Sequence, residues 1–175
     1  MSALDIILAP SPVLYKKTDF IVEIDKVVRK LSGNMFDTMY KFNGVGLAAP
    51  QVGKSIKMIV IDCSKTDEKF FPKTLINPKI LEISDILEFR EEGCLSFPNQ
   101  FYEVERPDYV KVEYLDIDGK INIKTFIGFE SICVQHEIDH LNGVLFVDHM
   151  SKLRKNIILR KMKKFKKNLP LERRE

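Results

Sequence analysis

Residues 133–141 read Cys-Val-Gln-His-Glu-Ile-Asp-His-Leu, and within them His136 and His140 form a His-Glu-x-x-His motif. On an α-helix, side chains four residues apart lie on one face, one turn from each other, so both imidazoles can bind a single metal ion. Glu137 directly follows the first histidine and can lie beside that ion as a general base. The motif therefore predicts a metal-dependent hydrolase whose site lies on a helix at about residues 130–142.

The composition is that of a globular protein, with 45% hydrophobic and 30% charged residues among 175. This length predicts one domain, residues 1–175, with a substantial core. The N-terminal apolar run is short, has no basic segment before it and is interrupted by Pro10 and Pro12, which argues against a signal peptide or a membrane span. Three cysteines argue against a disulfide framework. We expect a cytoplasmic protein with neither a membrane nor DNA as its partner.

The net charge of +3 conceals an uneven distribution. Residues 151–175 hold 11 Lys and Arg against two acids, a net charge of +9, which leaves −6 for residues 1–150. Ser151 as N-cap and an apolar stripe at intervals of three or four residues predict a helix to about Lys167. The sequence thus predicts an acidic body that carries a basic C-terminal helix and tail.

Hydrophobic periodicity predicts the other elements of the chain. They are an irregular lead-in at 4–15, a helix at about 24–41, strands at 57–62 and 74–83, a polar loop at 64–73, a hairpin of alternating strands around 110–125, and an extended piece at 144–147. We expect Pro78 to force an edge position or a bulge in its strand. Asp118-Gly119 predicts a two-residue turn for the hairpin.

Two histidines leave a third metal ligand to be found, and the candidates separate the classes of site. Metalloproteases with the longer motif need a histidine six residues after the second one, and Phe146 stands there. Proteases with a downstream glutamate need one on a following helix, but the later glutamates are Glu172 and Glu175, in the charged tail. Asp148 and His149 remain candidates within one tight turn. The protease hypothesis is therefore weakened.

A cysteine thiolate is the other candidate for the third ligand. Cys133 shares the helix with the histidines, but it lies about 10.5 Å from His140 along a helix. Metal–ligand bonds are only about 2.0–2.3 Å long. Cys94 lies in a non-helical segment between Gly and Pro residues and can approach from outside the helix. Cys94, His136 and His140 would leave one coordination position open, which is typical of a catalytic site.

Three segments together resemble the signature motifs of the bacterial peptide deformylase family. They are Gly-Val-Gly-Leu-Ala-Ala-Pro-Gln at 44–51, Glu-Gly-Cys-Leu-Ser at 92–96 and Gln-His-Glu-Ile-Asp-His-Leu at 135–141. The resemblance covers essentially the whole chain and is to members with a C-terminal helix. It implies an α+β fold in which β-sheets surround a central helix that carries the motif, with further helices near the N- and C-termini. It also implies removal of the N-formyl group from the N-terminal formylmethionine of newly synthesised proteins, with release of formate.

The resemblance implies roles for the residues that match. Cys94, His136 and His140 would hold one divalent metal ion, with Fe(II) as the usual native ion and Zn or Ni as substitutes. Water activated at that ion would attack the formyl carbon, and Glu137 would act as general base and then as general acid.

The other matching residues would bind the substrate. Gln51 and the Leu95 backbone N–H are similar to the family's donors to the oxyanion. The backbone from Gly44 to Gly46 is expected to pair with the extended peptide. An apolar pocket for the methionine side chain is expected from Val45, Leu95, Ile132 and Cys133.

Two positions depart from the family pattern, so the peptide preference beyond the first residue is left open. Asn43 stands where many members carry an acidic residue, and Phe101 stands where some carry Arg. The expected partners are N-formylmethionyl nascent peptides. The basic tail has two interpretations, a solvated helix packed on the body or a surface that docks on ribosomal RNA.

The alternatives to the deformylase hypothesis are a His-Glu-x-x-His metalloprotease and a non-catalytic ribosome-binding protein. The second alternative predicts loss of Glu137 or Cys94, and both are present.

Overall fold

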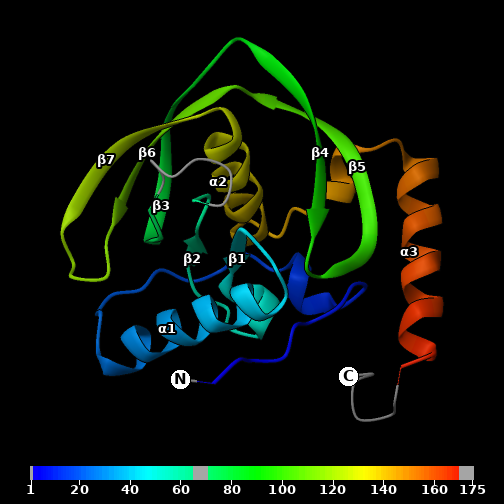
Figure 1. Cartoon of the computed structure of the whole chain (residues 1–175), viewed down its shortest axis with the longest axis horizontal. Coiled ribbons are helices and arrows are strands. Elements are labelled where there is room, and N and C mark those ends of the chain that lie inside the picture. Colours follow the sequence, from blue (N-terminus) through cyan, green and yellow to red (C-terminus); the bar gives the residue numbers. More distant parts are fainter. Residues whose placement is uncertain (1, 65–70, 170–175) are drawn as a thin grey trace.

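The computed structural model describes residues 2–64 and 71–169, which form an α+β fold (Figure 1). The α-helices are α1 (Lys26–Lys41), α2 (Gly128–Leu141) and α3 (Lys152–Lys167). The strands are β1 (Gly46–Ala48), β2 (Met58–Ile61), β3 (Lys73–Ile83), β4 (Leu87–Cys94), β5 (Phe97–Pro107), β6 (Tyr109–Leu115) and β7 (Ile121–Ile127). Short 3₁₀ helices occur at Pro12–Tyr15, Ala49–Val52 and Phe146–His149. The α+β fold implied by the resemblance is confirmed.

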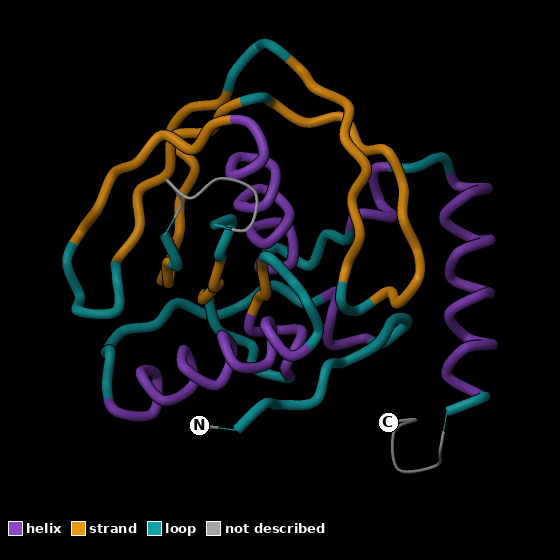
Figure 2. The backbone as a smooth tube through the Cα atoms, viewed as in Figure 1, coloured by secondary structure: helices purple, strands orange, loops and turns teal. Residues whose placement is uncertain are grey.

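The strands form two antiparallel sheets. The first has the order β1-β2-β3-β6-β7, and the second is the ribbon of β4 and β5. Figure 2 shows that strands of both sheets curve around α2. As a result, the ribbon and the short strand β1 approach this helix from different sides.

Helix α2 is buried on nearly all sides. Its apolar residues Val134, Ile138 and Leu141 pack against the inner face of the five-stranded sheet, where they meet Leu75 and Phe126. Its polar residues are also buried. A helix buried all round has no solvated face for polar groups. The buried polar side chains of α2 therefore need partners inside the molecule.

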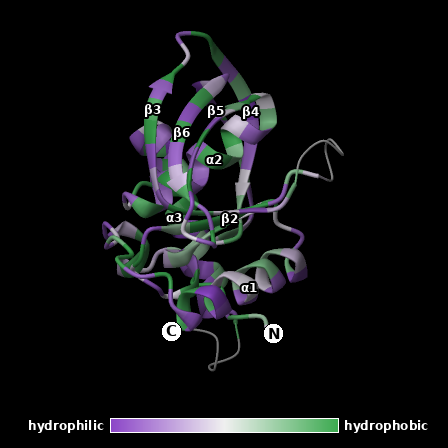
Figure 3. Cartoon of the chain, turned by 90° about the vertical axis from the view of Figure 1, so that its left-hand side faces the viewer, coloured by the Kyte–Doolittle hydropathy of each residue, from purple (hydrophilic) through white to green (hydrophobic). Residues whose placement is uncertain are grey.

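Helices α1 and α3 lie outside the sheets, and each is amphipathic. Met35 and Met39 of α1 belong to a core cluster with residues of β1 and β2, and Figure 3 shows both hydrophilic and hydrophobic residues along this helix. Ile158 and Met162 of α3 pack with Phe97 and other residues of the ribbon. The predicted N-cap of α3 is confirmed, since the Ser151 hydroxyl accepts a hydrogen bond from the Arg154 N–H.

The structure corrects the expectations at three places and decides between two alternatives at a fourth. β4 and β5 were not predicted as strands. The hairpin of β6 and β7 is confirmed, but residues 116–120 connect it where a two-residue turn was expected. Residues 146–149 form a 3₁₀ helix, so the extended piece at 144–147 was wrong at its end. The bulge at Pro78, one of the two expected alternatives, is confirmed by a register shift between Ile76 and Lys79, and the edge position is excluded because β3 lies between β2 and β6.

Parts of two expected segments lie outside the described residues. These are residues 65–70 of the predicted polar loop and residues 170–175 of the basic tail. Within the described part of the chain, none of the helices combines the length and the apolar character that crossing a membrane requires.

Candidate metal centre

The structure brings Cys94, His136 and His140 together. The histidines lie on one face of α2, and Cys94 ends β4, where the ribbon turns back toward this helix. One ligand atom from each residue falls in a group whose members all lie within 4.8 Å of one another. Cys94 Sγ is 3.3 Å from His140 Nε2. This convergence joins two segments that are more than 40 residues apart in sequence.

The chemistry of these donors fits a transition-metal ion. Imidazole suits zinc, iron and nickel, and a thiolate binds such ions strongly. Both histidines are buried, so a cation at this point would be largely shielded from water. Asp148 and His149 have other partners: Asp148 accepts a hydrogen bond from the Leu145 N–H, and His149 lies 2.8 Å from Asp139.

Glu137 lies beside this group with one carboxylate oxygen unused. Burial raises the pKa of Glu137 to about 7. Its Oε2 is buried and has no hydrogen-bond partner among the described residues. The carboxyl group packs directly on Gly46, where an added Cβ would come within 2.5 Å of Oε1. A carboxyl group with a free oxygen and a pKa near neutrality is suited to accept and return a proton.

Gln51 also points toward the three ligands. Its Oε1 accepts a hydrogen bond from the Ala48 N–H, which directs its amide nitrogen toward Cys94 and Ser96. That nitrogen is 3.5 Å from Cys94 Sγ and donates to Ser96 Oγ at 3.3 Å. Leu95 directly follows Cys94 at the tip of the ribbon. Gln51 is therefore a fixed hydrogen-bond donor at the edge of the centre.

A buried ion network behind the histidines was missed by the sequence analysis. His136 Nδ1 lies 2.8 Å from Glu92 Oε2, and the same carboxylate accepts two hydrogen bonds from Arg106. Arg106 also donates to Asp139 on α2 at 2.8 Å. The sequence held a signal for this network, because Glu92 lies two residues before Cys94 and Asp139 one before His140. Without contacts, however, nothing in the sequence pairs Arg106 with them.

The surroundings favour a charge on Glu92 and on His136 but disfavour a charge on His140. Burial alone would raise the pKa of Glu92, but hydrogen bonds from His136 and Arg106 lower it to about 2, so Glu92 is a carboxylate. Burial disfavours a charge on His136, yet its hydrogen bonds to Cys94 and Glu92 outweigh this and raise its pKa well above the usual value. Burial and the neighbouring His136 hold the pKa of His140 well below its usual value.

A carboxylate that accepts from Nδ1 leaves Nε2 of the same ring as the metal-binding atom. The Glu92–Arg106 pair can therefore orient His136 from behind.

A cleft of about 850 Å³ opens onto this centre. Ten of the eleven predicted site residues line it, all except His140: Gly44, Val45, Gly46, Gln51, Cys94, Leu95, Ile132, Cys133, His136 and Glu137. Cys133 forms part of the cleft wall, and its thiol is hydrogen-bonded to that of Cys63. Phe146, which stands in the place of a protease ligand, is buried with its ring 6.2 Å from the His136 ring.

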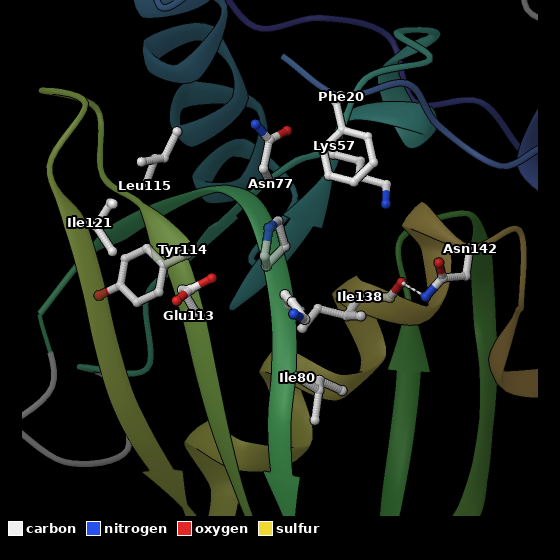
Figure 4. Close-up of a pocket in the computed structure, with 12 residues that line it drawn as sticks. Phe20, Lys57, Asn77, Ile80, Glu113, Tyr114, Leu115, Ile121, Ile138 and Asn142 are labelled. Carbon is white, nitrogen blue, oxygen red and sulfur yellow. Dashed lines mark hydrogen bonds between the residues drawn. The ribbon is translucent and has the colours of Figure 1, made fainter. Parts of the chain in front are cut away.

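A second hollow of about 500 Å³ lies behind α2 (Figure 4). Ile138 of α2 and Asn142, just after this helix, line it together with residues of β3 and β6. On a helix, Ile138 lies two positions from each histidine, so its side chain points about 160° away from both. None of the predicted site residues lines this hollow, so it is separate from the metal centre.

Comparison with known proteins gives one consistent family. The family model described as Polypeptide deformylase matches residues 3–156. The peptide deformylase of Mesorhizobium japonicum is 47% identical over 163 residues, which are 93% of each chain. That of Brucella suis is 48% identical over 164 residues, 94% of each chain.

Solved structures agree with this result. The peptide deformylase of Ehrlichia chaffeensis in complex with actinonin has a TM-score of 0.91 at 38% identity, and the match covers 94% of this chain and 98% of that one. The peptide deformylase of Legionella pneumophila has a TM-score of 0.88 at 40% identity, with 97% and 100% coverage.

Removal of the Arg106 guanidinium tests the buried network. We expect Arg106→Met to lower the free energy of unfolding by about 3–5 kcal/mol, because it leaves the Glu92 carboxylate buried without its cation. Arg90→Met is the matched control, since Arg90 forms a partly exposed pair with Glu88 in the same ribbon. The control should cost no more than about 1 kcal/mol. Equal losses in the two variants, measured by denaturant unfolding, would contradict this account of the network.

Proposed function

Because the chain belongs to the polypeptide deformylase family, it is a metal-dependent hydrolase that acts on the N-formyl group of newly made proteins, and we propose how its own residues divide the work. The observation that carries the proposal is the convergence of Cys94, His136 and His140 beside the buried Glu137 at the base of one cleft. We infer a divalent ion at these three ligands, with Fe(II) as the native ion and Zn or Ni as substitutes. When bound, such an ion supplies Lewis acidity, which makes a water molecule acidic enough to lose its proton near neutral pH.

Glu137 serves as the proton carrier of the reaction. Its carboxylate accepts the proton of the attacking water and then returns it to the leaving amine, so that formate and a free N-terminus result. Two features support this role, the pKa of about 7 that burial gives Glu137 and the oxygen without a partner. A metalloprotease would use the same base, but Phe146 stands where the longer protease motif has its third histidine, and its ring lies 6.2 Å from that of His136.

Gln51 and the backbone N–H of Leu95 stabilise the oxyanion that forms when the formyl carbon is attacked. Hydrogen-bond donors that are already in place stabilise a developing negative charge strongly in a buried site, because they need no reorganisation during the reaction. The Ala48 N–H holds the Gln51 carbonyl oxygen, so its amide nitrogen faces the centre. This anchoring supports Gln51 as a preorganised donor.

The substrate peptide lies along β1 and places its methionine in the apolar part of the cleft. β1 is at the edge of the five-stranded sheet, so one side of its backbone has no neighbouring strand among residues 2–64 and 71–169. An extended peptide can pair with such an edge, here at Gly44 to Gly46. The methionine side chain then enters the pocket formed by Val45, Leu95, Ile132 and Cys133.

We place this activity in one domain of residues 1–175 in the cytoplasm. The described core clusters join all three helices to the sheets, which supports one domain. Cys63, Cys94 and Cys133 are not joined in disulfides, as expected in a reducing compartment.

The basic helix α3 serves as a docking surface for ribosomal RNA. Its buried face uses Ile158 and Met162, which leaves the basic side chains of the other face in solvent. The exposed ones are Lys152, Arg154, Arg160, Lys161, Lys163, Lys164 and Lys167. Such a surface binds phosphates without sequence preference and weakens as salt rises. Docking there would bring the cleft close to emerging N-termini.

Glu137→Gln tests the proposed reaction. This change keeps the shape of the side chain against Gly46 but removes its ability to accept a proton. We expect formate release from a formyl-Met peptide to fall by about 10²–10⁴-fold while the bound metal, measured by elemental analysis, is retained. An unformylated peptide of the same sequence is assayed in parallel. Retained deformylation would refute Glu137 as the base, and cleavage of peptide bonds would favour the protease alternative.

Neutralising exposed lysines tests ribosome docking. We expect the Lys161→Gln, Lys163→Gln, Lys164→Gln triple variant to bind ribosomes about tenfold or more weakly, with a smaller dependence of affinity on salt, because phosphate contacts are lost. The matched control replaces the same number of exposed lysines on the body, Lys26, Lys30 and Lys54. Equal affinities for the two variants in a sedimentation assay would refute the role of α3.

A further inference from the structure

The third histidine of the chain closes the outer end of the buried ion network. His149 Nε2 lies 2.8 Å from Asp139 Oδ2, and the same oxygen accepts a hydrogen bond from Arg106 at 2.8 Å. A carboxylate oxygen only accepts, so Nε2 of His149 carries a proton and donates it to this bond. His149 was a candidate metal ligand on sequence alone, and the structure places it at the opposite end of the network from the metal centre.

A continuous line of hydrogen bonds joins His149 to the metal ligand His136. From Asp139 the line passes to Arg106, which also donates to Glu92 Oε2 at 3.1 Å. The same Glu92 oxygen lies 2.8 Å from His136 Nδ1. Asp139 Oδ2 and Glu92 Oε2 are thus each shared by two neighbouring groups. A displacement of one group along the line therefore changes the geometry of the next.

Asp139 is the link that needs a second partner. It lies on α2 directly before His140, and its side chain is 23% exposed. Arg106 directs its other donors to Glu92, so one hydrogen bond ties the guanidinium to Asp139. If this carboxylate turned toward water, a donor of the buried Arg106 would be left without a partner, which is costly. The hydrogen bond from His149 holds the carboxylate from its other side.

The support for His149 comes from an element outside α2. His149 ends the 3₁₀ helix Phe146–His149, which packs against β5 and α3. Phe146 and Val147 of this short helix are buried in one core cluster with Phe97 of the ribbon. The backbone that carries His149 is therefore fixed by the core, and the ring is presented to α2 from a packed element.

We propose that His149 is a positioning residue for the metal centre. It holds the Asp139 carboxylate on Arg106. Arg106 then keeps Glu92 behind His136, which leaves Nε2 of His136 for the ion. This inference rests on the proposed function, because the ion itself is inferred. Removal of a group that orients a metal-bound histidine typically lowers metal affinity about 10–100-fold, and a group that acts through others should have a smaller effect.

The rate of metal release from the Co(II)-loaded, full-length protein tests the proposal. Excess EDTA is added, and the decay of the cobalt absorption is followed. We expect His149→Leu to release Co(II) about three- to tenfold faster than the unsubstituted protein. His149→Gln should stay within about twofold of the unsubstituted protein, because its amide nitrogen can donate in place of Nε2. Rescue by Gln separates the hydrogen bond from a general loss of packing.

Lys155→Gln is the matched control. Lys155 pairs with Asp148, the neighbour of His149, and the exposed fractions of these two side chains are 31% and 25%. Those of His149 and Asp139 are 34% and 23%. The Lys155–Asp148 pair lies outside the network, so the control should release Co(II) at the rate of the unsubstituted protein.

A double substitution tests the route of the effect. In Asp139→Ala the line is already cut, so the addition of His149→Leu should not accelerate metal release further. A full effect of His149→Leu in this background would show that His149 acts by another route, and it would overturn the proposal.

Three other results would also overturn it: an unchanged release rate in His149→Leu, an equal acceleration in Lys155→Gln, or a His149→Gln variant as fast as His149→Leu. Formate release from a formyl-Met peptide is measured on the same samples. If metal release depends on His149 but no formate is released, the proposed function fails and the role of His149 stands. If formate is released and metal release does not depend on His149, the role of His149 alone fails. A protein that binds no Co(II) would refute both.

Discussion

A buried network attaches the β4–β5 ribbon to helix α2 through Glu92 and Arg106, and the candidate metal centre depends on this attachment. Arg106 holds Glu92 within the ribbon and donates to Asp139 on the helix, while Glu92 meets His136. The ribbon brings Cys94 and the helix brings the two histidines, so the three donors meet only if ribbon and helix keep this relation. A buried ion pair is a costly way to join two elements unless all its groups find partners. Here each carboxylate oxygen of Glu92 has one.

The second constraint is the lack of a side chain at Gly44 and Gly46 in the glycine-rich segment. At Gly46 an added Cβ would collide with Glu137, and at Gly44 it would come within 2.9 Å of Leu95. Glycine at position 46 therefore allows the backbone of β1 to lie directly against the carboxyl group of Glu137. The same closeness brings the edge of β1 to the place where the proposed substrate peptide would present its first residue. The packing against Glu137 and the proposed mode of peptide binding therefore both require glycine in this segment.

The sequence predicted the elements that follow a strong period and the motif with fixed spacing. Helices α1 and α3, the hairpin of β6 and β7, and the pair His136 and His140 were all readable in this way. The ribbon was not, because a strand is recognised by alternation of apolar and polar residues, and the inner face of this one carries Glu92 and Arg106. Charged residues on a buried face interrupt the alternation of apolar and polar residues, and such exceptions are expected near functional sites.

Contacts between distant residues were also beyond the sequence. Cys94 could be proposed because few donors remained, whereas Arg106 had no feature that paired it with Glu92 and Asp139. The position of the Phe101 ring over Gly93 likewise depends on the cross-strand register of the ribbon.

The identity of the sulfur ligand is the central claim, and cobalt substitution tests it most directly. Co(II) bound by a thiolate gives a sulfur-to-cobalt charge-transfer absorption, whereas Co(II) bound by nitrogen and oxygen alone does not. We expect this absorption when Co(II) is added to the metal-free protein and to Cys133→Ser, and its loss in Cys94→Ser. An absorption that persists in Cys94→Ser, or that disappears in Cys133→Ser, would contradict the site described above.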